Sequence, residues 1–202
     1  MTTADPLQRA LHDTGDLPLR PLPQRAAELL EALDAPPRLA AHLRAVHDVA
    51  HQLVGWAERR YPTLRIDRDA VLFGAATHDL GKTVHVAELG GSGSRHEEAG
   101  RELLLSHGVS AQLARFAATH ASWSVLDPDD PAAIEDLLVS VADKVWKNKR
   151  VPELEDLLVA RLAAVSGREV WEEFLALDEV LARIGEDADA RLDFQAAHPV
   201  RR

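Results

Sequence analysis

The sequence predicts an all-α fold. From Gln24 onward it is rich in Ala, Leu, Glu and Arg, which favour helix, and poor in runs of β-branched residues. Apolar residues recur at three- and four-residue steps, which is the spacing of one helix face. The 202 residues, 46% of them hydrophobic, are enough for one domain with a substantial core. We therefore expect a single helical domain over residues 24–202, preceded by a flexible or loosely docked arm over residues 1–23.

The expected elements follow in order along the chain. Four prolines interrupt any periodic pattern within the N-terminal arm. Helices are expected over residues 24–34, 37–60, 68–79, 96–107, 110–121, 131–148, 152–165, 168–183 and 186–195. Pro37 at the start of the second helix and Asp67 before the third are common helix-start residues. The Gly/Ser-rich stretch over residues 81–95 is the one long loop expected within the domain, and we interpret it as a mobile cover over a pocket.

Composition narrows the classes of partner and site. The net charge of −10 argues against nucleic acid or an anionic membrane as the main partner, because both require a basic surface. The chain has no cysteine, so any metal must be held by histidine and carboxylate. No stretch approaches about 18 uncharged apolar residues, and the N-terminus lacks the hydrophobic region of a signal peptide. We therefore expect a cytoplasmic protein.

Residues that can bind metal fall on the inward faces of several expected helices. The set consists of His47, His78, Asp79, His96, His120 and Asp143. His47, for example, shares one helix face with Leu43 and Val54. Neutral imidazole and carboxylate suit divalent transition metals such as Fe, Mn or Zn, and two such ions held close together can hydrolyse a phosphate ester. The set therefore suggests a two-metal site.

Asp79 has the properties of a bridging ligand. It lies at the C-terminal end of its expected helix, where the helix dipole disfavours a carboxylate, so a buried anion there requires a cation. A carboxylate has two oxygens and can contact two metals, whereas a neutral imidazole offers one lone pair to one metal. His78 and Asp79 diverge by about 100° around the helix, so a shared site must lie between their directions.

The order of these residues resembles that of the HD-domain superfamily, which carries His, then His-Asp, then Asp. Its dinuclear branch inserts two more histidines before the last Asp, as His96 and His120 are placed here. The local motifs also match: His-Asp-Leu-Gly-Lys at 78–82, His-Glu-Glu-Ala-Gly at 96–100, Ala-Thr-His at 118–120 and Val-Ala-Asp-Lys at 141–144. The resemblance covers residues 39–150. It implies an all-α HD-domain helical bundle with an interior metal site.

The resemblance also implies the ligand arrangement. One metal would be held by His47, His78, Asp79 and Asp143, and the second by His96 and His120, with Asp79 bridging. The cofactors would be two divalent ions, Fe or Mn first, with Zn, Mg, Ni or Co as alternatives. A mononuclear member would instead use His96 and His120 to bind substrate, and this alternative stays open. His42 and His51 are interpreted as groups outside the ligand set, close to the site or at the surface.

The implied activity is that of a metal-dependent phosphohydrolase. It would cleave a small phosphorylated compound, with a nucleotide as the first choice, by attack of a metal-activated hydroxide. Asp79 and Lys82 would be catalytic, and Lys82, Arg95 and Lys144 would bind the substrate, because their positive charge offsets that of a transferred phosphoryl group.

Two other functions stay open. Mixed-valent di-iron oxygenases of the same superfamily use the same six-ligand set, although Lys82 in its His-Asp-x-Gly-Lys motif favours a hydrolase. A domain of this kind could also act without catalysis, as a nucleotide-binding sensor or interaction module. The identity of the substrate and the oligomeric state do not follow from the sequence.

Overall fold

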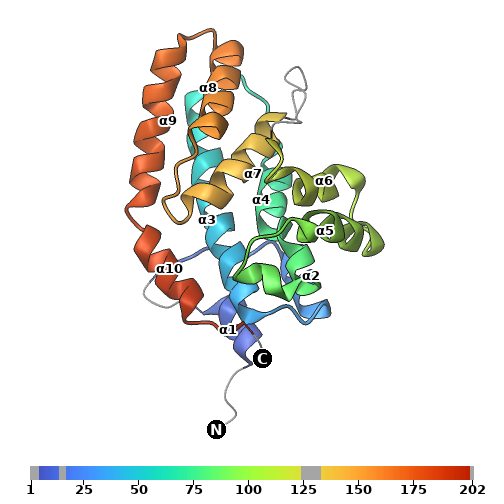
Figure 1. Ribbon diagram of the computed structural model, residues 1–202. Coiled ribbons are helices and arrows are strands. Elements are labelled where there is room, and N and C mark those ends of the chain that lie inside the picture. The colour runs from blue at the N-terminus through green and yellow to red at the C-terminus, as the bar shows by residue number, and fades with distance from the viewer. Residues whose placement is uncertain (1–4, 14–16, 124–132, 201–202) are drawn as a thin grey trace.

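The computed structural model describes residues 5–13, 17–123 and 133–200, and these residues form helices and no strand (Figure 1). The α-helices are α1 (Pro6–His12), α2 (Gln24–Ala32), α3 (Pro37–Arg60), α4 (Arg68–Thr77), α5 (Arg95–Ser106), α6 (Ala111–Thr119), α7 (Ala133–Val145), α8 (Pro152–Ser166), α9 (Val170–Gly185) and α10 (Ala188–Ala196). The all-α class predicted from the sequence is confirmed. Within the described ranges, no helix combines the length and apolar character needed to cross a membrane.

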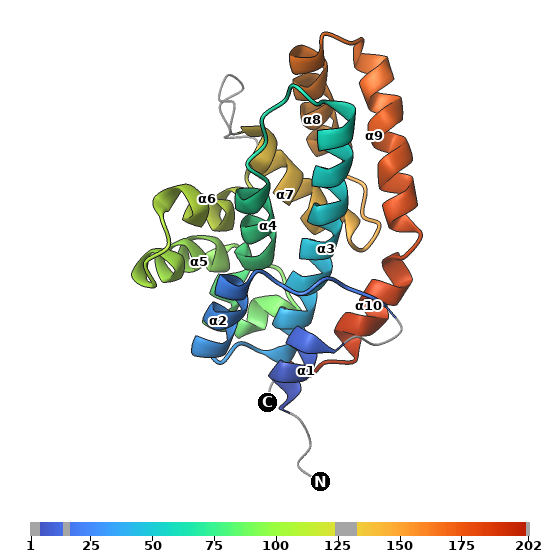
Figure 2. The same cartoon turned by 180° about the vertical axis from the view of Figure 1, so that it is seen from behind.

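Helix α3 is the central element of the fold. It packs against α1, α4, α7, α9 and α10, and the views from both sides show it running along the middle of the molecule (Figures 1 and 2). Two clusters of buried apolar residues meet along it: one contains Leu39 and Leu43 near its start, and the other contains Val49 and Leu53 further on. A helix placed this way can bring side chains from its different faces to different parts of the interior.

The helix starts follow local signals in the sequence. Helix α3 begins with Pro37 in its first turn, where the missing N–H of proline costs nothing. The Asp67 side chain caps α4 by accepting a hydrogen bond from the Ala70 N–H at 3.0 Å. Ser110 caps α6 in the same way through the Leu113 N–H. These caps set where the helices that carry the site residues begin.

The N-terminal region differs from the flexible arm expected over residues 1–23. Residues 6–12 form α1, and Leu7 and Leu11 are buried against the core. The buried guanidinium of Arg44 donates hydrogen bonds to the carbonyl oxygens of Asp13 and Leu19, which ties this region to α3. Prolines suggested an unstructured arm, but two leucines four residues apart bury an apolar face, and that burial stabilises the docked helix. Residues 1–4 and 14–16 lie outside the described ranges.

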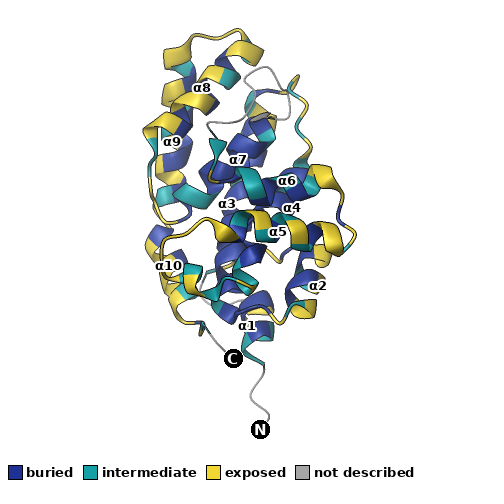
Figure 3. Ribbon diagram, turned by 45° about the vertical axis from the view of Figure 1, so that its right-hand side comes forward, coloured by how far each residue is buried: buried dark blue, intermediate teal, exposed yellow. Residues whose placement is uncertain are grey.

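The stretch expected as a long loop, 81–95, contains two short 3-10 turns, η1 (Leu80–Thr83) and η2 (Val86–Leu89). The glycine- and serine-rich part after η2, residues 90–94, lies between the helices and is exposed throughout. Colouring by burial shows that α3, α4 and α7 lie inside, whereas α8 and α9 expose one side to solvent (Figure 3). The ends of the buried helices therefore provide an interior position for polar groups.

Candidate metal centre

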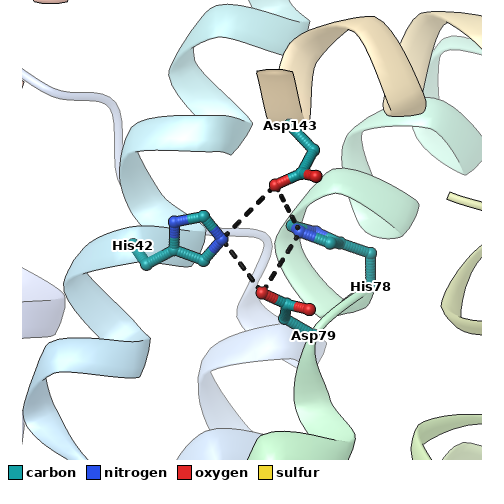
Figure 4. A group of neighbouring side chains, drawn as sticks. All are labelled: His42, His78, Asp79 and Asp143. Carbon is teal, nitrogen blue, oxygen red and sulfur yellow. Dashed lines mark ion pairs between the residues drawn. The ribbon is translucent and has the colours of Figure 1, made fainter. Parts of the chain in front are cut away.

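Four side chains from three helices meet in the interior (Figure 4). They are His42 from α3, His78 and Asp79 from the end of α4, and Asp143 from α7. The His42 Nε2 atom lies 3.1 Å from Asp79 Oδ2, and the His78 Nε2 atom lies 3.4 Å from Asp143 Oδ1. One ligand atom from each of the four lies within 4.8 Å of the others, so a single metal ion could contact all of them. We call these four residues the first group.

A second group shares Asp79 with the first. It consists of Asp79, His96 near the start of α5 and His120 at the end of α6. The Nε2 atoms of His96 and His120 lie 3.1 Å and 3.6 Å from Asp79 Oδ1, whereas His42 approaches Oδ2. Each oxygen of Asp79 thus faces a different group, which is the arrangement of a carboxylate that bridges two ions.

Hydrogen bonds on the far side of the rings orient the histidines. The Nδ1 atoms of His78 and His120 each lie 3.0 Å from a backbone carbonyl oxygen in their own last helical turn. Because a carbonyl oxygen only accepts, both Nδ1 atoms must donate, and the lone pair of each ring is on Nε2, facing the site. The Nδ1 atom of His96 donates to the Glu88 carboxylate at 2.6 Å. Such outer partners are typical of metal-binding histidines.

Two glycines bring the second group close to the first. A Cβ atom on Gly81 would lie 2.0 Å from the carbonyl oxygen of His96 and 2.6 Å from the Gly100 backbone nitrogen. No side chain fits in that space, so α5 packs directly on the backbone that follows Asp79. Gly81 belongs to the His-Asp-Leu-Gly-Lys motif, and its structural role is therefore to let His96 approach Asp79.

The donor set fits a bound cation. Among the described residues, the buried atoms that lack a hydrogen-bond partner include both ring nitrogens of His42, the Nε2 of His78 and the Oδ1 of Asp79. Buried polar atoms are nearly always satisfied in folded proteins, and a metal would satisfy the Nε2 atoms of His42 and His78 and the Oδ1 atom of Asp79. Helices α4 and α6 end at His78 and His120, and the negative ends of their dipoles also favour a cation there.

The protonation states agree with this interpretation. Burial opposes ionisation of Asp79, but His78, His42, His96 and Lys82 outweigh it and hold the pKa of the carboxyl well below its usual value. Burial, followed by the nearby His78, lowers the pKa of His120 to about 4. At neutral pH the site thus offers an ionised carboxylate at Asp79 and a neutral imidazole at His120, which are the forms that bind metal. Burial lowers the pKa of His96, but the hydrogen bonds with Asp79 and Glu88 outweigh burial and raise it.

The structure differs from the sequence prediction at one ligand position. His42, not His47, lies in the first group. The charged neighbours of His47 are Asp48, His51, Arg20 and Arg44, and its Nδ1 atom is buried without a partner among the described residues. Five residues along a helix turn the side chain by about 140°, so the two histidines cannot face the same site.

The error has a physical cause. The first half of α3 is buried on nearly every side, so an apolar stripe beside a histidine shows only that the ring points into the protein. Leu39, His42 and Val46 form a second apolar row, which competes with the row that contains His47. The sequence alone could not tell which row faces the ends of α4 and α7.

Of the three basic side chains expected to bind substrate, two line the cavity at the metal centre and one does not. The Lys82 Nζ atom lies 2.6 Å from Asp79 Oδ2, and the Lys144 Nζ atom lies 2.5 Å from Asp143 Oδ2. Both lysines line a cavity of about 340 Å³ that opens onto the two groups. Arg95 is exposed and is not among the residues that line this cavity. The structure therefore brings together Lys82 and Lys144, but not Arg95.

Some cavity residues had not been expected from the sequence. Leu192 and Gln195 reach the cavity from α10, and Lys147 reaches it from just after α7. Glu88, which orients His96, also had no motif to reveal it. The contribution of α10 depends on how the C-terminal segment folds back on α3, and no local pattern encodes that contact.

Comparisons with known proteins place the chain in a family. The sequence model of the HD domain matches residues 24–146, more than half of the chain, and this segment contains every member of the two groups. No curated protein and no solved structure matches significantly. HD domains bind divalent metal ions, and most members of the family are metal-dependent phosphohydrolases. This chain belongs to the HD-domain family.

Proposed function

We propose that this HD domain is a metal-dependent phosphohydrolase that cleaves a small phosphorylated compound, most directly a nucleotide. The observation that carries the proposal is the position of Asp79, whose two oxygens face two separate histidine-containing groups. Paired divalent ions at such a site are suited to clamping and hydrolysing a phosphate ester.

The residues divide into two metal sites. The first ion would be held by His42, His78, Asp79 and Asp143, and the second by Asp79, His96 and His120. Bound divalent ions supply activation of water and neutralisation of phosphate oxygens, so the reaction needs no serine or cysteine nucleophile. Fe and Mn are the first choices, since nitrogen and oxygen donors suit both.

The cavity has the charge needed for an anionic substrate. Lys82, Lys144 and Lys147 line it, opposed by the carboxylate of Glu97, in a protein with an overall charge of −10. When metal ions neutralise Asp79 and Asp143, the ammonium groups of Lys82 and Lys144 become free to donate to phosphate oxygens. Positive groups placed where negative charge grows in the transition state lower its energy.

The other walls of the cavity suit the rest of a small molecule. Leu89, Trp146 and Leu192 provide apolar surface, and Gln195 offers an amide for hydrogen bonding. The volume of about 340 Å³ falls at the small end of ordinary ligand sites. A compound of nucleotide size or smaller therefore fits better than a polymer.

The decisive experiment is hydrolysis without oxygen. Protein purified anaerobically and loaded with Mn²⁺ is assayed under argon against a panel of phosphorylated compounds. We expect release of phosphate or of a nucleotide product, loss of that activity in Asp79→Asn, and retention in Asp136→Asn, a matched change at a buried carboxylate that pairs with Arg115 outside the site.

The same experiment separates the other candidates. Turnover that strictly requires O₂ and iron, with no phosphate ester cleaved, would replace the proposal with a di-iron oxygenase. Nucleotide binding with no turnover under any metal would indicate a sensor or interaction module.

A further inference from the structure

A second cavity lies on the outer part of α3, away from the metal centre. It has a volume of about 460 Å³ and is formed by α3, the start of α4, the α9 helix and the segment before α2. Four arginines line it, together with a histidine and a tryptophan, and we call this set the arginine pocket: Arg20, His51, Trp56, Arg59, Arg68 and Arg183. Glu58 also lines the cavity and pairs with Arg68 at 2.6 Å, so the four arginines leave an excess of positive charge. Such a gathering of positive charge is unexpected in a protein with a net charge of −10.

The arginine pocket is separate from the metal centre. None of the residues that line it lines the metal cavity. His51 lies nine residues after His42 on the same helix, a separation of about 14 Å along the axis. Arg20 and Arg183 also lie outside the segment matched by the HD-domain family. The pocket therefore combines the shared core with parts particular to this chain.

The guanidinium groups have more donors than the protein satisfies. Arg59 has no ion-pair partner among the described residues. The pairs of Arg20 with Asp48 and of Arg183 with Glu179 each use a single arginine nitrogen, at 2.7 Å and 3.1 Å. The pair of Arg183 with Glu179 is exposed, and such pairs contribute little stability, whereas Arg20 pairs with the buried Asp48. The guanidinium nitrogens that these pairs leave unused can donate to a multiply charged anion.

The tautomer of His51 adds a hydrogen-bond donor to the arginine pocket. Its Nε2 atom lies 2.8 Å from Arg68 Nη2, and since a guanidinium only donates, Nε2 must accept. The proton of the neutral ring is then on Nδ1, which adds a further donor. Burial, followed by the charges of Arg20 and Arg68, lowers the pKa of His51, and the carboxylates of Asp48 and Glu58 offset this only in part.

Gly55 keeps the floor of the pocket open. It lies inside α3, where glycine costs about 1 kcal/mol relative to alanine. A Cβ atom at this position would meet only the Arg59 Nη1 atom, at 3.3 Å, and no core residue within 4 Å. Close helix packing therefore does not explain the glycine. Its effect is to leave space beneath the Arg59 guanidinium.

We propose that the arginine pocket binds a polyphosphate group, such as that of a nucleoside triphosphate, at a site distinct from the metal centre. Guanidinium groups match phosphate oxygens in geometry and charge, and several of them around one cavity suit several phosphoryl groups. Half-buried Trp56 offers an aromatic wall on which a base can stack. The proposal does not depend on hydrolysis at the metal centre.

Calorimetric titration of the full chain, as purified, tests this proposal. The probes are the non-hydrolysable triphosphate AMP-PNP and inorganic tripolyphosphate, which distinguish a nucleotide from a bare polyphosphate. We expect Arg59→Ala and Gly55→Leu each to weaken binding at least about tenfold, because the first removes charge-assisted hydrogen bonds and the second fills the cavity. Leucine also favours helix, so Gly55→Leu should keep the helical content of the wild type.

Matched controls locate the binding event. Arg101→Ala removes an exposed arginine on α5, and Lys82→Ala changes the metal cavity; neither should alter the affinity of the arginine pocket. Binding that is lost in Lys82→Ala but unchanged in Arg59→Ala would overturn the proposal, because all of it would then occur at the metal centre. The proposal would equally be overturned if neither probe bound at millimolar concentration.

Discussion

Two buried histidines on α3, His42 and His47, occupy contrasting surroundings. Both are almost fully buried, at 7% and 4% exposed. His42 faces the carboxylates of Asp79 and Asp143, whereas the charged groups around His47 include two arginines and one carboxylate. Burial is thus common to both, and the neighbouring carboxylates distinguish the histidine that can bind a cation from the one that is part of the core.

The contrast has an electrostatic basis. A cation beside His42 gains from two ionised carboxylates that are buried and weakly screened by solvent. A cation beside His47 would meet the guanidinium groups of Arg20 and Arg44 instead. Each substitution below changes the surroundings of one of these two histidines and leaves those of the other intact.

The largest effect is expected from Asp79, which distinguishes the two surroundings most strongly. Asp79→Ala removes the carboxylate shared by both groups, so we expect loss of most of both metal ions and of hydrolysis. Elemental analysis and the phosphatase assay measure these losses.

The variant His120→Ala should lose mainly one metal. Retention of two metals at full occupancy in His120→Ala would show that the second group is not a metal site.

A smaller effect is expected from Lys82. Lys82→Ala should lower kcat about tenfold to a thousandfold while the metal content stays at the wild-type value, because the ammonium stabilises charge that grows in the transition state. The comparison variant is Lys149→Ala, an exposed lysine that follows α7 and does not line the cavity. An unchanged kcat in Lys82→Ala would remove the lysine from the catalytic machinery.

The next prediction concerns how the free energy of unfolding depends on pH, and it tests the surroundings of His47. Burial, partly offset by Asp48, lowers the pKa of His47 to about 4. The unfolded chain, with a histidine pKa of about 6.5, takes up this proton first, so stability falls as the pH drops from about 6.5 to about 4. The loss is at most on the order of 3 kcal/mol.

Urea denaturation with EDTA present measures this loss without interference from metal binding. His47→Leu should have a shallower dependence of the unfolding free energy on pH over that interval, because the titrating group is gone. An identical slope in the wild type and in His47→Leu would show that His47 has the same pKa in the folded and unfolded protein.

The smallest effect is expected at the loop after η2. Residues 90–94 are exposed, and Gly93 among them lines the metal cavity together with Leu89. Hydrogen exchange should be fast at residues 90–94 in the free protein and slower when a substrate analogue binds, since glycine permits the motion of a cover. Equal protection in both states would exclude a covering role for this loop.

The sequence was sufficient for the fold class and for the general location of the site. Helix-favouring composition and periodic apolar residues act locally, so they identify helices without knowledge of their packing. His78 and Asp79 could be singled out because a buried carboxylate at a helix end requires a cation. The order and local motifs of His96, His120 and Asp143, which resemble those of the HD-domain superfamily, added the remaining members.

Features that depend on packing between distant segments could not be predicted. The choice between His42 and His47 depends on which face of α3 meets α4 and α7, and both faces are apolar. The docking of α1 depends on the buried Arg44, whose hydrogen bonds to backbone carbonyls leave no mark in the sequence pattern. The contribution of α10 to the cavity has the same origin.

The central claim is that His42, and not His47, belongs to a metal centre that this HD domain uses for hydrolysis. Metal content of anaerobically purified wild type, His42→Ala and His47→Ala, measured side by side after loading with Mn²⁺, tests it most directly. We predict about two ions per chain in the wild type, clear loss in His42→Ala, and wild-type content in folded His47→Ala. Full metal content in His42→Ala together with loss in His47→Ala would contradict the account.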